Sequence, residues 1–133
     1  MQRYRFVVII FAFAAVFVAP LTHAEGRCPG AAFTEVWSLE ALPNKLRHMF
    51  PSSRIGVDGI ADRGGRFNAT DVIVHDWPMR RFVLAAVGKS CAVVAIEYGG
   101  RAHGFELSEY RLTGEVWNAG ERRTLSRSQQ RIC

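Results

Sequence analysis

The sequence predicts an α+β domain in which an N-terminal helical layer packs on a five-stranded antiparallel β-meander. Two observations lead to this prediction. Between residues 55 and 112, short runs rich in Val, Ile, Phe and Tyr alternate with turn residues, which is typical of consecutive β-hairpins. Before these runs, apolar residues recur at helical spacing, which indicates an amphipathic helix. Helices on one side of an antiparallel sheet define the α+β class.

The first 24 residues resemble a secretory signal peptide. Arg3 and Arg5 precede an unbroken apolar run over residues 6–19, and the tripeptide Thr-His-Ala closes the segment. The run is shorter than the ~20 apolar residues of a spanning helix. We therefore expect residues 1–24 to be a signal peptide and the protein to be exported, either to the periplasm or to the extracellular space. An uncleaved N-terminal anchor is the alternative, and a membrane is an expected partner only in that case.

The charge of the chain argues against nucleic-acid binding. The 17 Lys and Arg residues outnumber the 12 Asp and Glu residues, and without Arg3 and Arg5 the balance is 15 against 12, or +3. Residues 121–133 alone hold four arginines against one glutamate. The body of the protein is therefore nearly neutral, whereas a nucleic-acid-binding domain carries basic residues across its fold.

We expect one domain over residues 25–120, since this length suffices for a single core. Its last part, residues 113–120, includes Trp117 and forms either a loop or a short sixth strand. Residues 121–133 are polar and rich in arginine. They are expected to form a basic C-terminal tail, either solvated or used as an arm for an anionic partner.

The helical layer is expected directly before the sheet. Pro43 suits the first turn of a helix over residues 43–50, and Pro51 would end it. Residues 32–41 fit either a second helix or an extra strand. The apolar residues with helical spacing are Leu42, Leu46, Met49 and Phe50.

The five strands are expected between turns that contain glycine or proline. Glycine supplies positive φ and proline presets a bend, so these residues predict tight turns. The turns are predicted at residues 64–65, 77–79, 88–90 and 99–100. The strands between them are residues 55–63, 66–75, 80–87, 91–98 and 101–112.

Counting across these turns gives a register for the sheet. The expected cross-strand pairs are Phe82 with Ile96, Leu84 with Val94, Arg81 with Glu97, and Val94 with Phe105. This register gathers the larger apolar side chains on one face, as a buried face requires. That face would carry Val72, Val74, Phe82, Leu84, Val94, Ile96, Phe105 and Leu107.

One end of the opposite face is the candidate site. The register aligns His75, Arg81 and Glu97 across three strands. A carboxylate held by an arginine near a histidine can act as a general base or contact a polar ligand, so Glu97 and His75 are candidates for catalysis, although the sequence assigns no catalytic residue. The expected binding residues are His75, Trp77, Arg81, Glu97, Arg101 and His103. The simpler interpretation is a cross-strand ion pair, which contributes ~0.2–1 kcal/mol.

The three cysteines predict one disulfide with one cysteine left over. Cys133 ends a polar tail and has no packing reason to be a cysteine, so a bond between Cys28 and Cys133 is favoured. A bond between Cys28 and Cys91 is the alternative, and an intermolecular bond is a third arrangement. No cysteine or histidine spacing is diagnostic of a metal site, so neither a metal nor a cofactor is expected.

These features together predict a small exported protein that binds, inhibits or otherwise interacts with a partner through one end of its sheet. The partner would be a protein or a small polar ligand, and a homodimer is compatible with either. Two alternatives remain. One is a small hydrolase-like enzyme with Glu97 and His75 as acid and base. The other is a polyanion-binding protein that uses the arginine-rich tail.

Overall fold

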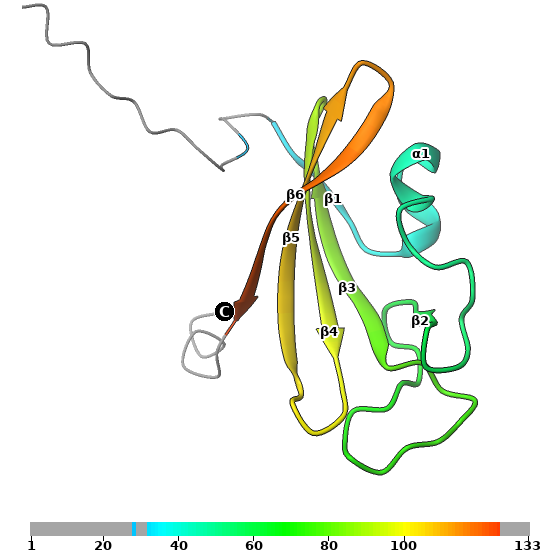
Figure 1. Cartoon of the computed structure of the whole chain (residues 1–133). Coiled ribbons are helices and arrows are strands. Elements are labelled where there is room, and N and C mark those ends of the chain that lie inside the picture. Colours follow the sequence, from blue (N-terminus) through cyan, green and yellow to red (C-terminus); the bar gives the residue numbers. More distant parts are fainter. Residues whose placement is uncertain (1–27, 29–31, 126–133) are drawn as a thin grey trace, which may run out of the picture.

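The computed structural model describes residue 28 and residues 32–125, and these residues form one mainly antiparallel sheet with short helical turns on one face (Figure 1). The strand order is β1-β3-β4-β5-β6, and β2 pairs with β3 off this path. The strands are β1 Thr34–Val36, β2 Ile60–Ala61, β3 Arg80–Val87, β4 Cys91–Tyr98, β5 Gly104–Thr113 and β6 Val116–Leu125. The helical turns are η1 Leu39–Ala41 and α1 Asn44–Arg47.

The expected N-terminal helical layer is wrong, and the protein is mainly an antiparallel β-sheet. Pro43 directly precedes α1, which ends after four residues at Arg47. The next two backbone bonds, from Met49 to Leu46 and from Phe50 to Arg47, join residues three apart, which is the tighter geometry in which helices end. The apolar residues at helical spacing therefore anchor a loop and one helical turn rather than a helix over residues 43–50.

The segment that fitted either a helix or a strand contributes an edge strand. β1 pairs antiparallel with β3, and Thr34 lies opposite Val87. Its Thr and Val residues are β-branched, which favours extended backbone. The chain then leaves the sheet at Ser38, whose hydroxyl oxygen accepts a hydrogen bond from the Ala41 backbone nitrogen at 3.3 Å and caps η1.

Two of the five expected strands do not form as predicted: one is a loop, and the other is reduced to two residues. Residues 66–75 form a loop, and only Ile60–Ala61 of residues 55–63 is strand, parallel to β3. The meander consists instead of β3, β4, β5 and β6. The sixth strand, left open by the sequence, is therefore present, and it runs beyond Gly120 to Leu125.

The observed register agrees with the expected one only where the start of β3 pairs with the end of β4. The pairs Arg81 with Glu97 and Phe82 with Ile96 are confirmed. A bulge between Phe82 and Leu84 then shifts the register, so the expected pairing of Leu84 with Val94 is wrong. The residue opposite Val94 is Ala85.

The second hairpin differs because its turn is longer than expected. Tyr98 pairs with Gly104, which leaves a five-residue turn over residues 99–103. Val94 consequently lies opposite Ser108 rather than Phe105. Because the expected turn over residues 99–100 had an even number of residues, the odd number observed moves Phe105 and Leu107 to the other face of the sheet.

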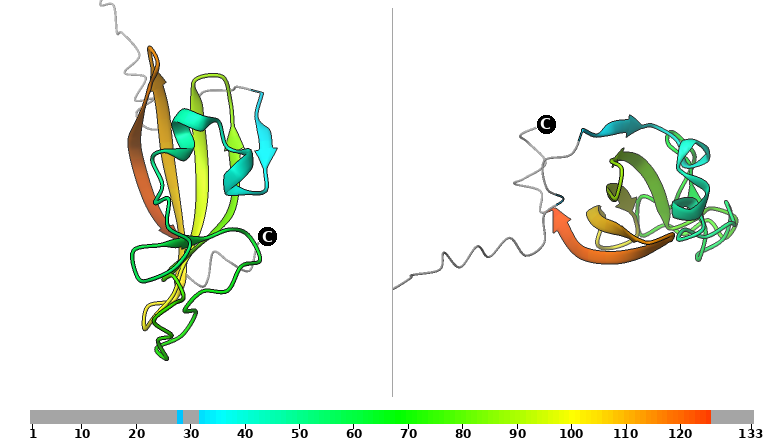
Figure 2. Two further views of the ribbon diagram at one scale, coloured as in Figure 1. Left: turned by 90° about the vertical axis from the view of Figure 1, so that its right-hand side faces the viewer. Right: turned by 90° about the horizontal axis from the view of Figure 1, so that it is seen from above.

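The helical turns lie over one face of the sheet in both views of Figure 2, and the core lies between them and that face. Leu39 and Leu46 from the two helical turns and Ile60 from β2 are fully buried. They pack on apolar residues of four strands, namely Phe82, Ala85, Ala92, Val94, Ile96, Tyr110 and Trp117. None of the helical turns in the described part of the chain has the length or apolar character of a membrane-spanning segment.

A disulfide joins Cys28 to Cys91 at the start of β4, with the two Cα atoms 5.8 Å apart. The favoured pairing of Cys28 with Cys133 is therefore wrong, and the alternative pairing of Cys28 with Cys91 is the one observed. Cys133 lies outside the described residues. Cys91 is buried on the face of β4 opposite the core residues Ala92 and Val94, and Cys28 lies within bonding distance of it there.

Candidate functional site

Glu97 on β4 is the centre of the candidate site. One carboxylate oxygen, Oε2, accepts hydrogen bonds from Arg81 Nε at 3.0 Å and from Arg81 Nη2 at 2.5 Å. The other, Oε1, lies 2.8 Å from Nε2 of His103. Glu97 is only 8% exposed. Both of its oxygens are therefore engaged, and the cross-strand ion pair expected between Arg81 and Glu97 is present.

Aromatic side chains surround this ion pair. The guanidinium carbon of Arg81 lies 4.3 Å from the ring centroid of Phe67, a cation–π geometry. The ring of His103 lies 6.5 Å from that of Phe67 and 6.1 Å from that of Phe105. The low-polarity surroundings strengthen the attraction between the charges, and they also make an unpaired Glu97 costly.

Sequence reasoning missed the two phenylalanines. Phe67 was assigned to a strand that does not form, and Phe105 was assigned to the opposite face of the sheet. Phe67 follows the expected turn at residues 64–65 closely, and nothing in the local sequence indicates that its ring contacts Arg81. Phe105 could be placed next to Glu97 only by knowing that the turn between β4 and β5 has five residues.

Three of the six expected binding residues are brought together, namely Arg81, Glu97 and His103. The other three lie on neighbouring loops. His75 and Arg101 are exposed, and Trp77 is half-buried with the Arg66 guanidinium 5.7 Å from its ring. Within the described residues, no hydrogen bond or ion pair joins His75 to Glu97, because residues 66–75 do not pair with β3.

The buried side chain of Asn68 helps to hold the loop over residues 66–79 in place. Its amide nitrogen donates to the carbonyl oxygens of Val74 at 3.0 Å and Trp77 at 2.8 Å. Its amide oxygen accepts from the Val74 backbone nitrogen at 2.7 Å. Asn68 is 1% exposed. These bonds replace the ladder that a strand would have made, which explains why the expected strand is a loop.

The same loop packs on the β4–β5 turn through backbone contacts. The Gly100 nitrogen donates to the Asn68 carbonyl at 3.1 Å, and the Gly99 nitrogen donates to the Met79 carbonyl at 2.9 Å. A Cβ atom on Gly99 would lie only 1.6 Å from the Asn68 carbonyl oxygen, so only glycine fits there. We call the loop over residues 66–79 and the turn over residues 99–103 together the loop end.

The tip of the loop end is apolar and exposed. Val72, Ile73 and Val74 are 72%, 42% and 39% exposed. Asp71, His75 and Asp76 flank them and are also exposed. The loop end therefore presents an apolar tip with a polar rim on a framework fixed by hydrogen bonds.

The geometry around Glu97 gives little support to catalysis. A general base needs an oxygen that can reach a substrate proton, and here both oxygens already have partners. His75, the other catalytic candidate, is exposed on the loop over residues 66–79 and makes no hydrogen bond or ion pair with Glu97 among the described residues. Among the residues that the structure describes, no group of three or more His, Cys, Asp or Glu side chains is arranged to hold a metal ion.

Comparison with protein-family models, with curated proteins and with solved structures finds no match to this chain.

Proposed function

We propose that this is a small exported binding protein that recognises a protein partner through its loop end. The observation that carries the proposal is the apolar tip formed by Val72, Ile73 and Val74 on a loop whose backbone is fixed by Asn68. Adjacent exposed apolar side chains with a polar rim are typical of interaction sites. A loop that is ordered before binding also loses less conformational entropy when the partner binds.

Export is supported by two features of the chain. The N-terminal segment resembles a signal peptide, and the Cys28–Cys91 disulfide is compatible with an oxidising compartment. We propose the periplasm or the extracellular space as the location. The partner would then be another exported protein or the exposed part of a membrane protein.

The two alternatives have weaker support. The hydrolase interpretation required a carboxylate open to substrate, whereas Glu97 is held on both oxygens. The polyanion interpretation rested on four arginines of the C-terminal tail. Of these, Arg122 lies 3.1 Å from Glu106 and Arg123 lies 2.7 Å from Glu121, so their charges are partly neutralised.

Photo-crosslinking in cells of the source organism tests the proposal. A photoreactive amino acid at position 73 should give an adduct of one defined mass, and the additional change Val72→Asp should abolish it. The matched control is position 116, where another exposed valine begins β6 at the opposite end of the sheet. Absence of an adduct at position 73, or the same adduct at both positions, would contradict the proposal.

A further inference from the structure

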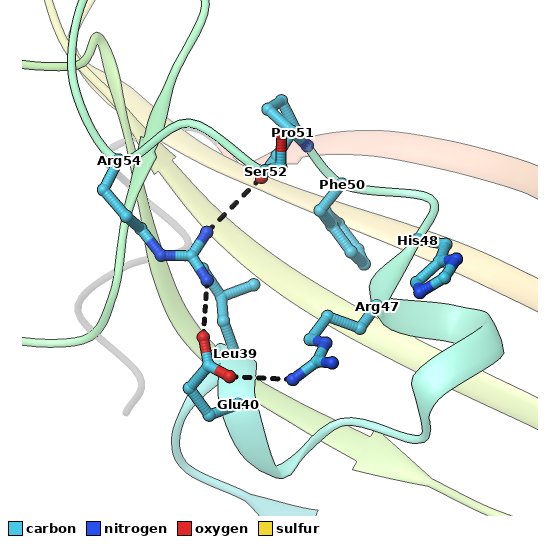
Figure 3. A pocket seen from close by; sticks show the side chains of 8 residues that line it. All are labelled: Leu39, Glu40, Arg47, His48, Phe50, Pro51, Ser52 and Arg54. Carbon is cyan, nitrogen blue, oxygen red and sulfur yellow. Dashed lines mark hydrogen bonds and ion pairs between the residues drawn. The ribbon is translucent and has the colours of Figure 1, made fainter.

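A cleft of about 530 Å³ lies at the helical turns, on a part of the molecule distinct from the loop end (Figure 3). Its walls come from η1, from the end of α1 and from the loop that follows. The residues that line it are Leu39, Glu40, Arg47, His48, Phe50, Pro51, Ser52 and Arg54. Its size is within the range of small-molecule sites.

The polar wall of the cleft has more positive than negative charge. Glu40 lies between two guanidinium groups, with Arg47 Nη1 at 2.7 Å from one carboxylate oxygen and Arg54 Nη2 at 2.8 Å from the other (Figure 3). Each arginine gives Glu40 a single hydrogen bond, although a guanidinium can hold a carboxylate with two. Arg54 gives a further hydrogen bond from Nη1 to the Pro51 carbonyl oxygen at 3.3 Å. The two arginines therefore share one carboxylate, and their other donors make no hydrogen bond among the described residues.

The opposite wall of the cleft is apolar and well supported. Phe50 is half-buried, and its ring centroid lies 5.5 Å from that of Tyr110 on β5. Leu39 beneath it is fully buried. Pro51 adds a rigid ring next to Phe50. An apolar wall beside two arginines is the surface that an organic anion with an apolar body requires.

We propose that this cleft binds a small organic acid, with its carboxylate between Arg47 and Arg54 and its apolar body against Phe50 and Pro51. Glu40 already holds a carboxylate at that position, and this is the reason for choosing a carboxylate over other anions. Its side chain is 65% exposed, so a ligand can displace it into solvent. Glu40 is then an internal competitor for the site. The proposal does not depend on the function of the loop end.

Titration of the full exported chain with benzoate, followed by NMR of the backbone amides, tests the proposal. Benzoate should cause saturable shifts in residues 47–54, and neutral benzamide should cause none. Glu40→Gln should bind benzoate about three- to fivefold more tightly, because exposed ion pairs are weak and the competitor is removed. The double change Arg47→Met with Arg54→Met should abolish binding.

Lys45→Met is the matched control. Lys45 belongs to the same helical turn but pairs with Glu115 at 2.8 Å outside the cleft, so its loss should leave benzoate affinity unchanged. Absence of saturable shifts in the wild-type protein would overturn the proposal, even if Glu40→Gln binds. Equal shifts with benzamide, or binding that survives loss of both arginines, would overturn it as well.

Discussion

At the scale of single residues, Glu97 shows how an expected functional group can have a structural role. It is buried on a central strand, and a buried carboxylate is stable only when it is paired and hydrogen-bonded. Arg81 and His103 meet this requirement with three contacts to two oxygens. The residue types that suggested a site therefore also explain how this end of the sheet is held together.

Removing Arg81 alone should be more harmful than removing both charges. Arg81→Met leaves Glu97 buried without its main partner, and we expect a loss of about 2 kcal/mol in the free energy of unfolding. Adding Glu97→Met should recover part of that loss, because no unpaired charge remains. Urea unfolding measures both values. Lys45→Met is the control, since Lys45 and its partner Glu115 have side chains that are 59% and 87% exposed, so both charges are solvated.

The single variant Glu97→Met completes the comparison. A double variant that loses the full sum of the two single losses would show that the pair is not coupled. In that case Arg81 would stabilise the fold through Phe67 and the Gly65 carbonyl oxygen rather than through Glu97.

Tyr110 should make the stability of the protein sensitive to alkaline pH. Burial raises the pKa of its phenol above the usual 10.0, while the nearby Arg122 acts in the opposite direction. The folded state therefore holds the proton more tightly than the unfolded state. This contribution to stability is complete below the unfolded pKa and is lost as pH rises through the folded pKa.

Tyr110→Phe should accordingly lose less stability than the wild-type protein as the pH rises above 10. Unfolding by urea over a series of alkaline buffers measures the difference. Equal slopes for the two proteins would show that another group is responsible for the alkaline loss.

At the scale of elements, the loop end depends on a backbone contact that tolerates no side chain. Gly99→Ala would place a methyl group against the Asn68 carbonyl, and we expect a loss of about 3 kcal/mol, as in overpacked sites. Hydrogen exchange should increase in residues 66–79 before it increases in β4. Gly120→Ala is the control, because its nearest contact would be an ordinary 3.4 Å. Similar stability losses for the two variants would contradict this explanation.

The sequence was sufficient for the elements that depend on local patterns. The hairpin of β3 and β4 and the pair of Arg81 with Glu97 followed from apolar runs and turn residues. The antiparallel sheet is therefore confirmed. The helical layer was wrong because apolar spacing near Pro43 does not distinguish a helix from a single turn that anchors a loop.

The remaining errors come from interactions that local patterns do not contain. The buried Asn68 side chain hydrogen-bonds to the backbone of Val74, and this holds residues 66–75 as a loop although their composition predicts a strand. The bulge after Phe82 shifts the pairing of β3 with β4 by one residue, and the longer β4–β5 turn shifts the pairing of β4 with β5 by three. Of the six candidate site residues, only the three at paired or adjacent positions therefore came together.

At the scale of the whole molecule, the disulfide connects the N-terminal segment to a central strand. Cys28 and Cys91 are 63 residues apart in sequence, and closing a loop of that length should stabilise the fold by about 4 kcal/mol. Replacing both cysteines by alanine should cost a similar amount. Peptide mapping without reduction should link Cys28 to Cys91. A link from Cys28 to the third cysteine, Cys133, would show that the pairing is wrong.

The five-residue turn between β4 and β5 also restricts how the gene can change. Its odd length directs Ser108 and Tyr110 toward the core and Phe105 toward the Glu97 side. Loss or gain of one codon would reverse both faces of β5 at once, whereas a change of two codons would preserve them. Over evolution, this turn is therefore free to lengthen or shorten only in steps of two.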